Sequence, residues 1–352
     1  MTGLLTIFAV ILLGIAIWQL VKIYDLSHAK ADNTQVATEK DNHINGLLMM
    51  AFLVFLHGFT IYSMFKWGDV LLPESASVHG KDVDQLMLIT FVVIFIVQAI
   101  TQALLHYFAY KYKGEEGKKA LFYADNDKLE FIWTIIPVIT LAGLIIYGLW
   151  TWTNIMKINE NDDPIFVEIY AQQFNWKVRY AGADNTLGLA NVRYVEGANV
   201  MGADMSDPNA HDDIVSTQEL RLPKGRKIIF KMRSQDVLHS AFMPFFRAQM
   251  NTVPGMVTQF SFTPDKTTEE ARQSLEIIEK VATINKIRTE KNIQLQAEGK
   301  ETLDPYEFDY LLLCNKICGA SHYNMQLKIV VDTEEGFNQW LSEQKTLAEV
   351  LQ

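Results

Sequence analysis

Four uncharged apolar runs dominate the first half of the chain. They cover residues 4–21, 47–65, 86–110 and 131–152. Each has roughly the 18 residues that a helix needs to cross the hydrocarbon core of a membrane. No basic residue precedes the first run, and it ends near Trp18 and Lys22 instead of a small-residue cleavage site, so we expect it to be retained. The pattern predicts a membrane anchor of four transmembrane helices.

Beyond Trp152 the pattern changes to alternation of apolar and polar residues. Period-two runs occur at residues 165–170, 227–232, 256–262 and 327–332. Such runs are typical of strands with one buried face. Several short strands of this kind predict a small all-β sandwich or barrel as the C-terminal domain.

Three stretches depart from this alternation. Residues 181–217 are rich in Gly, Asn, Asp and Ala and read as an irregular excursion between strands. Residues 267–298 are charged and helical, with one apolar stripe through Leu275 and Ile278 and a second through Ile277 and Val281. This insertion is either a solvated helix packed on the sandwich or a docking surface for a partner. An amphipathic segment, residues 333–351, is expected to cap the domain.

Loop charges predict the orientation of the helices. The segments 22–45 and 111–128 carry three and five lysines, whereas residues 66–85 carry two. The contributing lysines are Lys22, Lys30 and Lys40, then Lys111, Lys113, Lys118, Lys119 and Lys128, and finally Lys66 and Lys81. The positive-inside rule then places both termini and the polar C-terminal half outside the cytoplasm. The net charge of -10 and the lack of a basic stripe exclude a nucleic-acid partner.

The candidate chemistry lies in the stretch CNKICGASHYNM, residues 314–325. It offers two thiols, an imidazole and a thioether, a soft ligand set that suits copper in an electron-transfer site. A disulfide or a small zinc knot is the simpler interpretation of a bare cysteine pair, and a disulfide is ordinary outside the cytoplasm. Zinc rarely recruits methionine, however, and a disulfide leaves His322 and Met325 unexplained.

A second histidine upstream completes the set. His239 lies in SQDVLHSAFMPFF, and its addition gives two Cys, two His and one Met. That is one ligand too many for a single tetrahedral ion but enough for two copper ions bridged by both thiolates.

These motifs carry a resemblance to a known family. DVLHS followed by VPG, and then C-x-x-x-C-G-x-x-H-x-x-M, resembles subunit II of the haem-copper cytochrome c oxidases. The resemblance implies a cupredoxin-like β-sandwich with a binuclear copper centre (CuA) on loops at one end. One copper would take His239 and Met325, the other His322 and the backbone carbonyl of Lys316, with Cys314 and Cys318 bridging.

The membrane anchor carries the same resemblance in LEFIWTIIPVITL, residues 129–141. Glu130, three residues before Trp133, is either an interfacial carboxylate favoured by the helix dipole or, as the resemblance implies, the start of a proton-uptake path into subunit I. The family arrangement implies domains at residues 1–66 (an extra hairpin with no usual counterpart), 86–152 (the two-helix anchor) and 153–352 (the copper domain, with an insertion at about 266–300).

The resemblance implies the electron-input subunit of a proton-pumping terminal oxidase in a bacterial inner (cell) membrane. It would pass single electrons from a cytochrome c donor to haem in subunit I, where O2 is reduced to water, with subunit III as a further partner. The chain has no C-x-x-C-H haem motif of its own, so the haems and CuB belong to the partner subunit.

Two departures from the family pattern change these expectations. Lys316 stands where the family commonly has Glu, so we expect copper to be kept and magnesium to be lost or held differently. Phe174 and Trp176 stand where W-x-W is typical of the electron-input region. Lys177, Arg179 and Gln235 replace frequent acids, which would weaken steering of a basic cytochrome c. The donor would then be acidic, or a tethered cytochrome domain of a neighbouring respiratory complex.

Two other classes of function stay open. A membrane-anchored copper-binding module for copper storage or oxidase assembly explains the ligands but not Glu130 or the anchor motif. A quinol-oxidising relative is the third possibility, and the intact ligand set argues against it.

Overall fold

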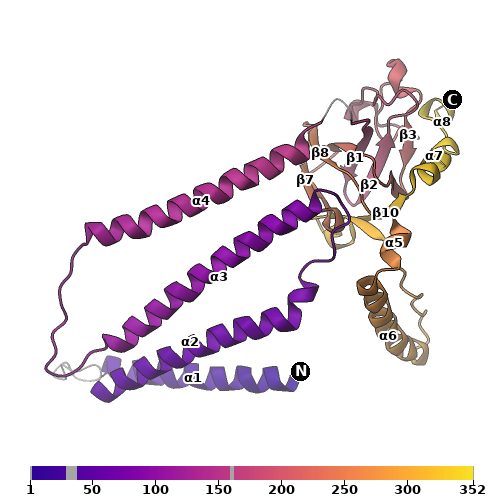
Figure 1. Ribbon diagram of the computed structural model, residues 1–352. Helices are drawn as coiled ribbons and strands as arrows, with labels where there is room; N and C mark the ends of the chain where they lie inside the picture. The colour runs from indigo at the N-terminus through magenta and orange to yellow at the C-terminus, as the bar shows by residue number, and fades with distance from the viewer. Residues whose placement is uncertain (1, 29–37, 159–161, 352) are drawn as a thin grey trace. The chain divides into compact units, whose positions relative to one another are not determined.

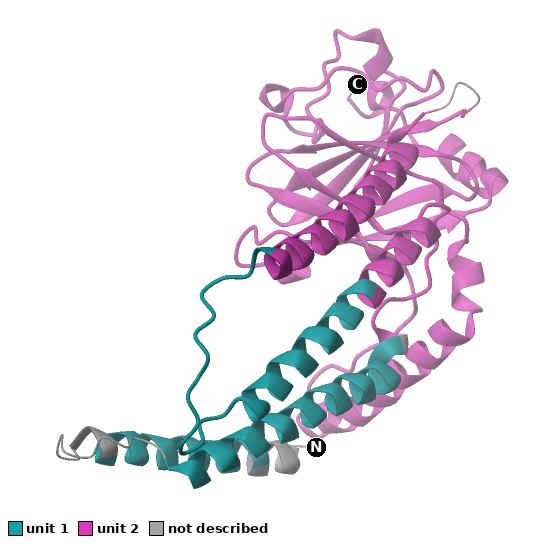
Figure 2. Cartoon of the chain, turned by 60° about the vertical axis from the view of Figure 1, so that its left-hand side comes forward, with its two compact units in different colours: residues 1–68, 93–127 teal, residues 69–92, 128–352 magenta. Residues whose placement is uncertain are grey.

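The computed structural model describes residues 2–28, 38–158 and 162–351. Lys30, one of the loop charges counted above, lies outside the described residues. The chain divides into two compact units, residues 1–68 with 93–127 and residues 69–92 with 128–352 (Figure 2).

Four long helices form the N-terminal part (Figure 1). They are α1 (Thr2–His28), α2 (Glu39–Trp67), α3 (Gly80–Lys111) and α4 (Asp127–Met156). All four are long and apolar enough to cross a membrane. The prediction of four transmembrane helices is therefore confirmed in number and place. Polar first turns extend the helices beyond the apolar runs; α2, for example, begins at a capping box between Thr38 and Asp41.

Within the first unit, α2 packs closely against the last turns of α3. Gly46 is buried, and a side chain there would stand 3.0 Å from the Tyr110 ring. The Asn42 amide donates to the carbonyl of Gly114 at 3.2 Å. His106 is buried next to Phe52, with ring centroids 5.8 Å apart. A small residue and matched polar groups thus allow these two helices to approach.

The C-terminal half folds into two five-stranded sheets, ordered β3-β2-β1-β5-β8 and β4-β10-β9-β6-β7. The strands of the first sheet are β1 (Ile165–Gln172), β2 (Asn175–Tyr180), β3 (Ile214–Ser216), β5 (Ile228–Ser234) and β8 (Thr258–Phe262). Those of the second are β4 (Glu219–Pro223), β6 (His239–Met243), β7 (Ala248–Thr252), β9 (Tyr310–Cys314) and β10 (Gln326–Asp332). Both sheets are mixed, because β1 runs parallel to β5 and β10 parallel to β4.

One apolar core joins the two sheets. Val167 and Phe230 of the first sheet and Leu312 and Ile329 of the second belong to the same buried cluster. Alternate residues of each strand enter this core, as the period-two runs predicted. The start of β8 was predicted wrongly: Met256 and Val257 are exposed and precede the strand, because the chain turns at Gly255 with a φ of 75°.

The insertion is helical, as expected, but broken into α5 (Thr268–Arg272) and α6 (Leu275–Ala297). Of its two apolar stripes, Ile277 and Val281 pack on the core, while Leu275 and Ile278 are exposed. The capping segment forms α7 (Glu334–Ser342) and α8 (Leu347–Val350), which bury Phe337 and Leu347.

The excursion between β2 and β3 contains two short 3-10 helices, η2 (Val192–Tyr194) and η3 (Pro208–Ala210), before β3 begins at Ile214. Three more 3-10 turns are η1 (Gly68–Val70), η4 (Pro244–Phe246) and η5 (His322–Asn324). The last of these lies within the stretch that carries the candidate ligands.

Candidate metal centre

The topology of the second sheet brings the candidate ligands together. His239 opens β6 and Cys314 closes β9, and these two strands pair antiparallel with Ala241 opposite Cys314. The loop from β9 to β10 then supplies Cys318, His322 and Met325. The amide of Cys314 donates to the carbonyl of Met325 at 3.1 Å, so the loop starts and ends at one point of the sheet.

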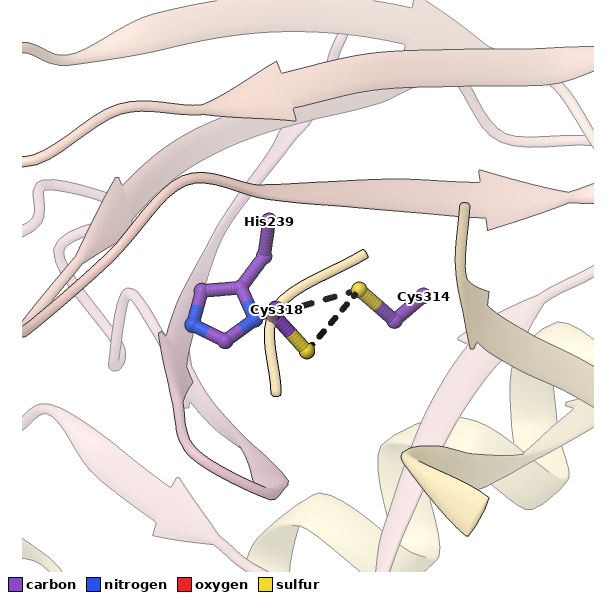
Figure 3. Close-up of side chains that lie close together, drawn as sticks. All are labelled: His239, Cys314 and Cys318. Atoms are coloured by element: carbon purple, nitrogen blue, oxygen red, sulfur yellow. Dashed lines mark hydrogen bonds between the residues drawn. The ribbon is translucent and has the colours of Figure 1, made fainter. Parts of the chain in front are cut away.

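Three of the ligands converge in space. His239 Nδ1 lies 3.8 Å from Cys314 Sγ, and Cys314 Sγ lies 3.8 Å from Cys318 Sγ (Figure 3). The three donor atoms lie within 4.8 Å of one another. A disulfide would hold its sulfurs at about 2.05 Å. The cysteines are instead two separate thiols with room for metal between them.

The other predicted ligands surround the same two sulfurs. Cys318 Sγ lies 3.5 Å from His322 Nδ1 and 3.8 Å from Met325 Sδ. Cys314 Sγ lies 3.2 Å from the carbonyl oxygen of Lys316. All six predicted donor groups are therefore brought together, and the mixture of thiol, imidazole and thioether fits copper chemically.

The site is mostly shielded from water. His239 is 0% exposed, Met325 1% and Cys318 6%. Burial and the neighbouring Cys314 thiol raise the pKa of Cys318 to about 11. The free thiol therefore holds its proton at neutral pH, and a metal must displace that proton to bind.

Asp236 orients the His239 ring. Its carboxylate accepts from His239 Nε2 at 2.9 Å, from the Gln173 amide at 2.7 Å and from the Val237 amide at 2.7 Å. Burial acts to raise the pKa of Asp236, but these hydrogen bonds outweigh it and hold the pKa below its usual value. Because Nε2 donates to a carboxylate, Nδ1 is left as the free lone pair and faces the thiols.

The turn between β1 and β2 closes over the ligand loop. The side-chain amide of Gln173 donates to the carbonyl of Cys318. Gly319 has a φ of 145°, and a Cβ there would stand 2.8 Å from Phe174 Cζ. Gln173 and Gly319 were not predicted as site residues; the glycine directly after Cys318 was the one available signal.

Phe174 and Trp176 both lie at the site but in different surroundings. Phe174 is half-buried against the ligand loop. Trp176 is 1% exposed, with its ring 6.1 Å from the His239 ring and its indole N–H donating to the carbonyl of Met325 at 3.5 Å. Trp176 is therefore an internal neighbour of the ligands, and Phe174 is the aromatic residue of this pair with more exposed surface.

Lys177 and Arg179, which were expected to weaken the steering of a basic donor, are both buried. Lys177 is 8% exposed and donates to the carbonyl of Val200 at 3.1 Å. Arg179 is 2% exposed and pairs with Glu168 at 2.6 Å and Asp213 at 2.8 Å. Both point away from the sandwich core, but the excursion between β2 and β3 covers that face.

Glu130 and the Lys316 side chain lie outside this cluster. Glu130 is in the first turn of α4 and is exposed. The Lys316 side chain is also exposed, so only its backbone carbonyl contributes to the cluster.

The fold and the site together define a class of protein: a membrane-anchored cupredoxin-like sandwich with a sulfur-rich candidate metal site where β6 begins and β9 ends. Comparison with known proteins agrees. The model of the cytochrome c oxidase subunit II transmembrane domain matches residues 65–150. The alternative cytochrome c oxidase subunit 2 of Bradyrhizobium diazoefficiens is 31% identical over 291 residues, 82% of this chain and 88% of the relative. The chain belongs to the cytochrome c oxidase subunit 2 family.

More distant likenesses accompany this match. Cytochrome c oxidase subunit 2 of Cereibacter sphaeroides is 20% identical over 77% of each chain. The crystal structure of the periplasmic domain of subunit II of cytochrome oxidase of Bradyrhizobium japonicum aligns with 53% of this chain and 95% of its own, at 16% identity and a TM-score of 0.30. The family assignment rests on the Bradyrhizobium diazoefficiens relative. It makes this chain a membrane component of an oxidoreductase complex.

Proposed function

We propose that this chain holds a binuclear copper centre of the CuA type. The observation that carries the proposal is the pair of unbonded cysteine sulfurs 3.8 Å apart, each with an imidazole Nδ1 within 3.8 Å. The cysteines would bridge two copper ions as thiolates. His239 and Met325 would complete one copper, and His322 and the Lys316 carbonyl the other.

Copper in this ligand set supplies one-electron chemistry. The residues supply a rigid frame: His239 and Cys314 stand on paired strands, and the other ligands stand on a loop whose two ends are hydrogen-bonded together. Such a frame limits rearrangement between oxidation states. Asp236 holds the His239 ring in the ligating orientation, and the turn at Gln173 holds the Cys318 backbone.

In the assembled complex, this site would accept electrons from a cytochrome c and pass them to haem in subunit I, where O2 is reduced to water. Phe174 is our candidate for the point of electron input, with Trp176 as an internal neighbour. Glu130 would begin a proton-uptake path, consistent with its exposed place at the start of α4. We place the copper domain on the periplasmic side of a bacterial inner membrane, with subunits I and III as partners.

The donor could be soluble or tethered. Lys177, Arg179 and Gln235 replace acids that are frequent in the family, but Lys177 and Arg179 are buried. Gln235 is therefore the one of these three substitutions that still favours an acidic donor. A basic cytochrome c and a tethered cytochrome domain therefore both fit the site. Salt titration of donor oxidation separates them, since steering of a basic soluble donor weakens steeply with ionic strength.

Copper analysis of the purified complex tests the proposal. We expect two copper ions per chain beyond those of the partner subunit, and loss of both in Cys318→Ser. Ser321→Ala is a matched control in the same loop, because the Ser321 hydroxyl makes no capping hydrogen bond.

A storage or assembly module would instead bind copper without passing electrons to the partner's haem. Rapid mixing with a reduced donor, either a soluble cytochrome c or a cytochrome domain of the tethered kind, should show reduction of haem in the wild type and the control. Failure of haem reduction with both donors in copper-loaded wild type would contradict the electron-input role.

A further inference from the structure

A cavity of about 420 Å³ lies on the outer face of the first sheet, and none of its lining residues is a candidate metal ligand. Its floor is formed by outward-facing residues of β1, β2 and β5, and its wall by residues 185–190 of the excursion. Among the floor residues, the charged ones are Glu168, Arg179, Lys231 and Arg233. The volume is within the range of small-molecule sites, roughly 300–1,000 Å³.

Part of this charge is neutralised within the floor. Arg179 pairs with Glu168 and Asp213, and Asp213 also accepts from the amide of Gly188 at 3.1 Å. Arg233 donates Nε to Glu168 and Nη2 to the carbonyl of Met201, and its guanidinium lies 4.5 Å from the centre of the Tyr170 ring. Two carboxyl groups thus face the two guanidinium groups, and Glu168 pairs with both.

Lys231 is the uncompensated charge. Its ammonium donates to the side-chain oxygen of Gln259, a neutral group, and forms no ion pair within residues 2–28, 38–158 and 162–351. Burial raises the pKa of Asp213, which lies behind the cavity wall, to about 7, so this carboxyl only partly offsets the two guanidinium groups at neutral pH. With Lys231 added, the cavity carries at least one excess positive charge in a chain of net charge -10. Nη1 of Arg233 also makes no hydrogen bond to the described part of the chain, so two donors remain available to a bound anion.

The rest of the lining is mostly apolar, with Asn185 and Thr186 as its polar side chains. Phe166, Leu187, Leu189 and Val257 line the cavity. Leu189 and Val257 are 69% and 58% exposed, so they border its opening to solvent. A ligand that matches both features has one negative charge and a compact hydrocarbon body. A phosphate dianion matches less well, because it would leave the apolar walls uncovered.

We propose that this cavity is a binding site for a small organic carboxylate, with its carboxylate on Lys231 and Arg233 and its hydrocarbon part against Phe166, Leu189 and Val257. The site is separate from the copper centre and does not depend on it. Lys231 contributes a charge-assisted hydrogen bond, and loss of such a bond costs about 1.5–3 kcal/mol, or roughly ten- to hundredfold in affinity.

Fluorine NMR of the purified oxidase complex tests the proposal, with 4-fluorobenzoate as the probe. We expect saturable binding that weakens at least tenfold in Lys231→Gln and is abolished in Val257→Glu, where an exposed carboxylate would stand at the opening. Lys328→Gln, a partly exposed lysine on β10 of the other sheet, is the matched control and should bind like the wild type.

Two further probes separate the alternatives. The neutral 4-fluorobenzamide should bind at least tenfold more weakly than the carboxylate, and inorganic phosphate should not displace the probe at equal concentration. The proposal is overturned if the carboxylate does not saturate, if Lys231→Gln binds it as the wild type does, or if the amide binds equally well. Because Lys231 and Val257 both contact solvent, co-purification of each variant with the complex confirms that it has folded.

Discussion

Substitution of Asp236 tests directly how the protein holds the His239 ring in the orientation and tautomer that bind a metal. Asp236→Asn keeps the size of the side chain but replaces one acceptor oxygen with an NH2 donor. The carboxylate now accepts three hydrogen bonds, from His239 Nε2, the Gln173 amide and the Val237 amide. If the new NH2 faces Gln173, two donors oppose each other. If it faces His239, the ring must accept at Nε2 and carry its proton on Nδ1, where the metal would bind.

Either orientation removes at least one charge-assisted hydrogen bond, worth about 1.5–3 kcal/mol. We therefore expect Asp236→Asn to lose copper to a competing chelator at roughly ten- to hundredfold lower chelator concentration, in line with the usual effect of residues that orient metal ligands. Asp304→Asn is the matched control. The Asp304 side chain is exposed, and Arg288 contacts only the backbone carbonyl of this residue, so the substitution should leave that contact in place. Equal copper retention in both variants would refute the role assigned to Asp236.

Three further predictions follow from particular contacts. Gly319→Ala should slow electron input several-fold in rapid-mixing experiments while copper is retained. The new Cβ would stand 2.8 Å from Phe174, and the φ of 145° disfavours a side chain. An unchanged rate would count against Phe174 as the point of electron input. Competition between manganese and magnesium on the complex should show no tight magnesium site next to Lys316, which stands where the family commonly has Glu. A tight magnesium site there would show that another group replaces the Glu carboxylate. Burial lowers the pKa of His79, so folding is favoured above pH 6.5 and loses stability as pH falls below it. The protection of residues 73–84 against hydrogen exchange, taken relative to the intrinsic exchange rate at each pH, should therefore fall between pH 7.5 and 5, and His79→Phe should reduce this change.

The convergence of the candidate ligands was predictable because most of them lie within one short loop. Cysteine, histidine and methionine at the spacing of residues 314–325 describe the coordination chemistry before any fold is known. His239 needed the DVLHS motif as well. The structure adds the reason that it meets the loop: β6 and β9 are neighbours in the second sheet.

The burial of Lys177 and Arg179 was not predictable from alternation. A period of two shows which residues share a face of a strand but not what covers that face. Every residue of β2 after Asn175 is buried, because the excursion packs on the outer face while the core covers the inner one. Residues 181–213 have no periodicity that would predict this packing.

The contacts between the β1–β2 turn and the ligand loop were also not predictable from the sequence pattern. Gln173 and Phe174 meet Cys318 and Gly319 across 145 residues of chain, and although Phe174 was predicted to lie in the electron-input region, no pattern predicted that either residue contacts the ligand loop. Their role depends on how the β1–β2 turn lies over the ligand loop, which only the packing of the two sheets determines.

The most direct test of the account is the electron paramagnetic resonance spectrum of the oxidised protein in its complex. Our account predicts one unpaired electron shared equally by two copper nuclei, with the signal lost in Cys314→Ser and Cys318→Ser. A signal from a single copper nucleus in this subunit, or no copper signal from it, would contradict the binuclear centre.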